Sequence, residues 1–213
     1  MIAGTICGRL QASLTISKAQ DNGQNSQTFS TSNQPLNSTN LRQDYALSDF
    51  DQRKRFTVSG YYVPPFDRIQ NRYLRGALNG FQLSGILAAY DGRPYNATVS
   101  GNPSPSGTTS GLLGMGGSSR LPWVGRNTYT NPGSVTLDAR LAREFRITER
   151  ARLQLIAEGF NVLNRVIVTG INTTAYNIRT ATLFPRTDFQ TISATSTNLV
   201  RERQLQLGAR FQF

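Results

Sequence analysis

The sequence predicts an all-β fold of antiparallel, up-and-down strands that cross a membrane, and three observations support this prediction. Residues 200–213 alternate apolar and polar side chains, which is the pattern of a strand with one apolar and one polar face. The segment exceeds the about five or six residues of a soluble strand and suits the roughly nine to eleven of a membrane-crossing strand. Five earlier segments alternate in the same way, and connections of contrasting length separate them.

The first two expected strands enclose a long polar stretch. Residues 7–18 place Leu10 on the face opposite Gln11, and a stretch rich in Asn, Gln, Ser and Thr follows. The second strand covers residues 53–63. Pro64 ends it, because proline cannot donate a hydrogen bond to a neighbouring strand.

The third expected strand covers residues 80–99. Its alternation reaches Tyr90 and resumes after a break at Asp91 and Gly92. Residues 101–132 follow, and their many Gly, Ser and Pro residues indicate one long loop.

The last three expected strands cover residues 134–146, 151–163 and 200–213. A tight turn at 147–150 joins the first two of these, and a loop over 164–198 leads into the last. We expect all six strands to belong to one domain, residues 1–213.

The composition excludes several classes of protein. Hydrophobic residues make up 38% of the 213 residues, and no run approaches the roughly 18 apolar residues of a membrane-spanning helix. The single cysteine, Cys7, rules out a disulfide framework, and the absence of histidine removes the usual zinc ligand and general base. We therefore expect no enzyme activity and no cofactor.

The strong positive charge is compatible with two interpretations. A net charge of +11 is compatible with a soluble β protein that binds a polyanion. The arginines, however, are spread along the whole chain, and arginine also lines polar lumens and extends to membrane interfaces. We expect no nucleic-acid partner.

The rhythm of the connections predicts an orientation. Transmembrane barrels have short periplasmic turns and long extracellular loops, so we expect the connections near Pro64 and Thr148 and the carboxy terminus to be periplasmic. Aromatic residues on the apolar face would form a periplasmic girdle at these strand ends: Tyr62, Phe81, Phe145, Phe211 and Phe213.

Two further groups are candidate functional residues. The opposite face of the fourth and fifth strands carries charges that we expect to face the lumen and to form ion pairs there: Asp138, Arg140, Glu144, Arg146, Arg152 and Glu158. The long loop before residue 134 carries four residues that either contact a ligand or pack on neighbouring loops: Arg120, Trp123, Arg126 and Tyr129.

Six motifs occur in an order that resembles a known family: Asp51–Gly60, Gly80–Ile86, Gly92–Tyr95, Leu137–Phe145, Glu158–Asn164 and Arg203–Phe211. The series is similar to the carboxy-terminal barrel strands of TonB-dependent transporters, especially the Oar-like group with a carboxypeptidase-regulatory-like amino-terminal domain. The resemblance covers about Leu47 to Phe213.

The resemblance implies a partial segment of a larger barrel of roughly 22 strands in a Gram-negative outer membrane. Its partners would be membrane lipid, the remaining barrel strands and the plug, with the TonB complex contacted through a missing amino-terminal part. The barrel-assembly machinery would recognise the alternating end of the chain: Leu205, Leu207, Ala209, Phe211 and Phe213. Without a plug, this chain alone should not transport a substrate.

Three alternatives remain open at this point. The chain could be a standalone or oligomeric outer-membrane pore, or the soluble polyanion-binding protein already considered. A soluble β-sandwich also has alternating strands, but loops of about thirty residues are uncommon in compact domains.

Overall fold

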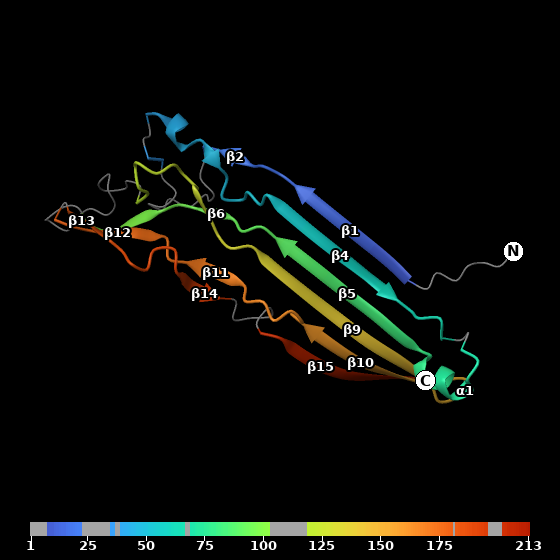
Figure 1. Ribbon diagram of the computed structural model, residues 1–213. Coiled ribbons are helices and arrows are strands. Elements are labelled where there is room, and N and C mark those ends of the chain that lie inside the picture. Colours follow the sequence, from blue (N-terminus) through green and yellow to red (C-terminus); the bar gives the residue numbers. More distant parts are fainter. Residues whose placement is uncertain are drawn as a thin grey trace.

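The computed structural model describes residues 8–22, 35–36, 39–66, 69–102, 119–180, 182–195 and 202–213. Its main element is a six-stranded antiparallel sheet in the order β1-β4-β5-β9-β10-β15 (Figure 1). These strands are β1 (Gly8–Ile16), β4 (Lys54–Tyr62), β5 (Phe81–Tyr90), β9 (Ser134–Arg146), β10 (Arg152–Phe160) and β15 (Gln204–Gln212). Each strand of the sheet pairs with the next one in sequence, which is the expected up-and-down arrangement.

The register places most apolar side chains of the sheet on one face. Leu10 of β1 lies opposite Gly60, Gly60 opposite Gly85, and Gly85 opposite Ala139. The row continues through Gly159 to Leu205. Because successive side chains on a strand point to opposite faces, this one row determines the face on which each remaining residue of the sheet lies. We call the two sides the apolar face and the polar face.

The apolar face is open to the surroundings. Leu207 is 75% exposed, and other exposed members of this face are Leu10, Leu14, Ile16, Leu83, Leu141, Leu155, Leu205 and Phe211. A soluble protein rarely exposes an apolar patch of this extent, because burying such area is the main driving force of folding.

The sheet is open at both sides. Among the described residues, β1 pairs only with β4 and β15 only with β10, so the strands do not close into a barrel. The backbone groups on the outer side of each edge strand can therefore accept a further strand.

Most of the predicted strands are confirmed to within a few residues. The strand over 134–146 matches β9 at both ends, and the other predicted ranges contain β1, β4, β10 and β15. Cys7, and residues 200–201 at the start of the predicted last strand, lie outside the described residues.

The prediction of one strand over 80–99 was wrong. β5 ends at Tyr90, and the following residues form β6 (Pro94–Tyr95) and β7 (Thr98–Asn102), which leave the main sheet. A Cβ atom at Gly92 would lie 1.8 Å from the Asn131 carbonyl oxygen, so the backbones approach too closely there for any other residue. β6 then pairs with β8 (Tyr129–Thr130), and β7 pairs with β12 (Thr174–Arg179).

The two ends of the sheet differ. The connections β1–β4, β5–β9 and β10–β15 meet at one end, which we call the loop end, and β4–β5 and β9–β10 at the other, the turn end (Figure 1). The turn end carries the short helix α1 (Arg72–Leu78), which was not predicted. The Asn71 side chain caps its start by accepting hydrogen bonds from the backbone N–H groups of Tyr73 and Leu74. No helix in the described part of the chain is long and apolar enough to cross a membrane.

The loop end is folded into small elements that the sequence analysis read as loops. They are β2 (Gln20–Asp21), η1 (Leu41–Asp44), β3 (Ala46–Leu47), β8, β11 (Val168–Ile171), β12 (Thr174–Arg179), β13 (Thr182–Pro185) and β14 (Ile192–Thr195). β6 and β7, which come mainly from the predicted strand over 80–99, join them. We call this region the loop cap. A buried apolar cluster lies within it, formed by Ala97, Val99, Leu121, Ala175 and Ile178.

Candidate functional site on the polar face and in the loop cap

The polar face of the sheet contains an open groove of about 610 Å³. Residues of five neighbouring strands line it, among them Arg9, Tyr61, Gln82, Arg140 and Glu158. The groove therefore combines both signs of charge with hydroxyl and amide groups, which suits contact with water or with a polar partner.

The six charges predicted to share one face do so, and most of them are paired. Arg140 lies directly opposite Glu158, with Nε 3.6 Å from the carboxylate. Arg152 reaches Glu144 across the same strand pair at 3.2 Å. These ion pairs are partly exposed, and such pairs contribute only about 0.2–1 kcal/mol each. Their main effect is to favour the observed register.

Asp138 and Arg146 differ from the rest of this group. The Asp138 carboxylate accepts a hydrogen bond from the Asn161 N–H at 2.8 Å, so it holds the end of β10. Arg146 is exposed and lies opposite Arg152, which leaves two like charges side by side.

Asn161 is the centre of a tight turn after β10. It is buried with φ at +47°, and its side chain both donates to the Arg165 carbonyl and accepts from the Arg165 N–H. Asparagine adopts this left-handed conformation more readily than most residues. The motif Glu158–Asn164 that carried the family resemblance is therefore the sequence of this turn.

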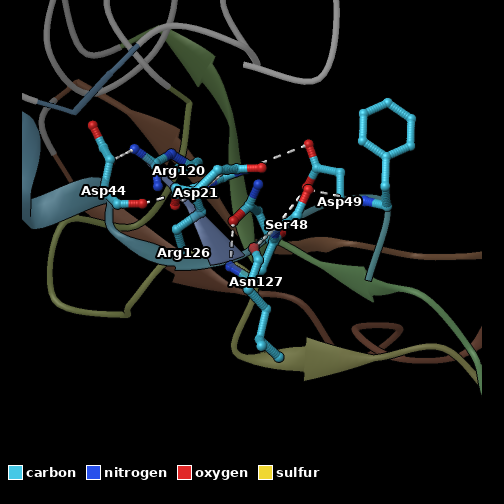
Figure 2. Close-up of polar contacts among 10 residues, drawn as sticks. Asp21, Asp44, Ser48, Asp49, Arg120, Arg126 and Asn127 are labelled. Carbon is cyan, nitrogen blue, oxygen red and sulfur yellow. Dashed lines mark hydrogen bonds and ion pairs between the residues drawn. The ribbon is translucent and has the colours of Figure 1, made fainter. Parts of the chain in front are cut away.

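Buried charges join separate loops in the loop cap. Arg120 forms an ion pair with Asp44, and both side chains are almost wholly buried (Figure 2). Arg126 donates to the Asp21 carboxylate at 2.5 Å and to the Asp44 carbonyl at 3.3 Å. The connection before β9 is thus tied to the connection after β1.

Asn127 extends this network. Its side-chain amide donates to the Leu47 carbonyl at 2.7 Å and to the Asp49 carboxylate, while its N–H donates to Asn96 (Figure 2). The acidic residues of these contacts come from the polar stretch 19–51, which the sequence analysis left without a function. The signal that could have identified them was the concentration of aspartates in this stretch, together with the arginines Arg120 and Arg126 in the loop before β9.

Aromatic contacts join the connection before β15 to the connection before β9. Tyr129 stacks on Tyr95 with ring centroids 5.7 Å apart, and it meets the edge of Phe189 at 5.4 Å. Trp123 contacts Tyr176 edge to face and remains 58% exposed. Of the four predicted ligand-contact residues, Arg120, Arg126 and Tyr129 therefore pack within the cap, and Trp123 presents much of its ring at the surface.

Three described groups in the cap have shifted pKa values: Tyr95, Arg186 and Asp188. Burial raises the pKa of the Tyr95 hydroxyl; a hydrogen bond with Gln190 opposes this shift and Tyr129 adds to it. The hydrogen bond from Arg186 lowers the pKa of Asp188, so this carboxylate stays ionised at neutral pH.

The aromatic residues expected at the strand ends gather at the turn end. Phe81 of β5 lies opposite Arg143, and Phe145 and Phe211 share a row through Leu153. Phe211 and Phe213 have ring centroids 6.1 Å apart. Tyr62 lies on the same face, one row further from this end. These aromatic residues form an interfacial girdle if the apolar face contacts a membrane.

The chain matches one family model over residues 9–120 and again over 117–206, and that family is described as an outer membrane beta barrel domain. The chain belongs to this family. The chain is therefore an outer-membrane barrel protein. No curated protein and no solved structure matches it.

Proposed function

We propose that this chain forms part of the wall of a TonB-dependent outer-membrane transporter, that it has no enzyme activity, and that it does not transport alone. The observation that supports the proposal best is the open sheet with one exposed apolar face and one charged face. Its two unpaired edges can join further strands of a larger barrel. The ordered motifs that resemble TonB-dependent transporters give the more specific assignment.

In this proposal the apolar face contacts lipid and the polar face lines the lumen. The groove with Arg140 and Glu158 would then face the plug or a passing substrate. The turn end and the carboxy terminus would be periplasmic, with the loop cap outside the cell, because short turns lie on the periplasmic side of such barrels. Tyr62, Phe81, Phe145, Phe211 and Phe213 would sit at the periplasmic interface.

A labelling experiment tests the facing of the strands. In a Cys7→Ser background, Gln206→Cys and Leu207→Cys place one thiol on each face of β15 at adjacent positions. In outer membranes, a water-soluble maleimide should modify the chain with Gln206→Cys and leave the one with Leu207→Cys unmodified. Both side chains are exposed on the sheet, so protection of position 207 would come from lipid.

Detergent provides the control, because it should make position 207 reactive as well. Equal reactivity at both positions in intact membranes would contradict the proposed wall.

Two observations separate the transporter from a standalone pore. A pore made of several copies would give steady ion conductance in planar bilayers, whereas a wall segment without its neighbours would not. The coding sequence upstream of Met1 is equally informative. An in-frame plug domain is expected there, and an upstream stop codon with its own promoter would contradict the assignment.

A further inference from the structure

Arg143 is a charged residue on the apolar face. On β9 it follows Val135, Leu137, Ala139 and Leu141 on that face and precedes Phe145. The register confirms the facing, because Arg143 lies opposite Phe81 on one side and Leu155 on the other. A charge in this position needs a specific reason, since an ion in contact with hydrocarbon is costly.

Two aromatic rings enclose the guanidinium group. The Arg143 Cζ atom lies 4.9 Å from the centroid of Phe81 and 4.4 Å from that of Phe145. Both distances fall within the range of cation–π attraction. The rings keep the arginine in place without neutralising its charge.

Arg143 also joins the sheet to α1. Its Nη2 atom donates to the Gly76 carbonyl oxygen at 2.9 Å. Its Nε atom is buried and has no acceptor among the described residues. Glu144 follows in sequence but lies on the opposite face, where it pairs with Arg152. The described residues therefore supply no carboxylate for Arg143.

The surface of α1 suits a membrane interface. Tyr73 is 80% exposed and Leu74 is 53% exposed. Arg72 lies one helical turn before Gly76 and stacks on Tyr73, and Arg75 is adjacent to it. Arginines outnumber acidic residues at the described turn end. It carries Arg72, Arg75, Arg143, Arg146, Arg150, Arg152 and Arg210, and the acidic residues Glu144 and Glu149.

We propose that Arg143 and α1 form a binding site for the phosphodiester headgroup of an anionic phospholipid at the turn end of the apolar face. Arg143 supplies the fixed positive charge, and the exposed apolar residues of α1 lie among the acyl chains while Arg72 and Arg75 extend toward the headgroups. This inference rests on the proposed lipid contact of the apolar face. The phosphatidylglycerol headgroup has the required chemistry.

Flotation with lipid vesicles tests the site. Binding of the full chain is compared between phosphatidylcholine vesicles and vesicles that contain an equal share of phosphatidylglycerol. Arg143→Gln should lower the preference for phosphatidylglycerol by about fivefold, the effect of one arginine near an anionic surface. Arg143→Lys should retain most of it.

Arg146→Gln is the matched control, because Arg146 lies on the same strand three residues away but on the polar face. It should leave the preference unchanged. An equal loss in both glutamine variants would show a general charge effect and overturn the site, and so would an unchanged preference in Arg143→Gln.

A second measurement leaves Arg143 in place. With Trp123→Phe and Phe145→Trp, the only tryptophan lies beside the guanidinium group. A quencher on the phosphatidylglycerol headgroup should quench it more strongly than the same quencher on phosphatidylcholine. Equal quenching would overturn the proposal, as would displacement of the lipid by soluble glycerol phosphate or a preference for lipopolysaccharide.

The outcome is separable from that of the proposed function. Protection of Leu207→Cys with no preference for phosphatidylglycerol would reject this site alone. Loss of that protection would reject the lipid-facing wall itself.

Discussion

Single polar residues determine how the strands end and how the loops are joined. Arg120 illustrates this, because it belongs to one connection and forms a buried ion pair with Asp44 from another. Removing one member of a buried ion pair leaves the other without a partner, which costs more than the pair contributes. The loop cap is therefore sensitive to substitutions that look conservative in the sequence.

Asn161 gives a prediction at this scale. Asn161→Gly keeps the φ of +47° accessible and loses the side-chain bonds to Arg165. Asn161→Ala loses the same bonds but, unlike glycine, has a Cβ atom in the left-handed region, which costs about 1–2 kcal/mol relative to the glycine variant. We expect the alanine variant to unfold at lower urea concentration than the glycine variant in detergent micelles.

Equal midpoints for the two variants would show that the backbone conformation at Asn161 carries no strain. A glycine variant as stable as the unsubstituted chain would show that the side-chain bonds contribute nothing.

At the scale of elements, β15 carries both the apolar residues of the proposed assembly signal and an edge that can pair with a further strand. Leu205, Leu207, Ala209 and Phe211 share the apolar face with Phe213 beyond the end of the strand. The outer edge of β15 is unpaired among the described residues, so it can add a strand during assembly. This arrangement agrees with the proposed recognition by the barrel-assembly machinery.

Deletion of Phe213 should therefore lower the amount of membrane-inserted protein several-fold when the full-length protein is expressed in a Gram-negative host. Phe213→Tyr should restore insertion, because it keeps the aromatic ring. Heat-modifiable migration of the outer-membrane fraction measures the effect. Unchanged insertion in the deletion variant would remove Phe213 from the proposed signal.

The strands of the main sheet could be predicted from the sequence, because a strand with one apolar and one polar face alternates apolar and polar residues. β9 has one apolar and one polar face along its whole length, and both of its ends were predicted. β6 and β7 could not be separated from β5 in the same way. Their alternation continues, and the close approach of Gly92 to Asn131 that ends β5 depends on a residue far along the chain.

The candidate site was predictable in part for a related reason. The charges on β9 and β10 follow from strand parity, so their shared face was predicted correctly. The partners of Arg120 and Arg126 lie more than seventy positions away in very short elements, η1 and β2, which have too few residues for a periodicity that would indicate their contacts. α1 was missed because a helix of seven residues has too little periodicity to detect.

At the scale of the whole molecule, the buried apolar cluster of the described residues lies in the loop cap. The sheet buries little apolar surface by itself, and its two edges have no strand partner among the described residues. Stability of the sheet must then come from surroundings that cover the apolar face and from strands that extend the edges.

This arrangement predicts aggregation of the chain when denaturant is diluted into buffer without detergent, and recovery of strand content in micelles. Exposed apolar area and free strand edges both favour association between chains. Light scattering and circular dichroism measure the two outcomes. A monodisperse monomer in plain buffer, with salt-dependent binding to a polyanion, would instead favour the soluble alternative.

The bond between Arg126 and Asp21 also bears on the order of folding. These residues are 105 positions apart, and β4 and β5 lie between them in sequence. Contacts of such large sequence separation form slowly, because the entropy of closing the intervening chain must be lost first. We expect the strands to pair before the cap closes, so the loop cap would reach its final structure only after the sheet has formed.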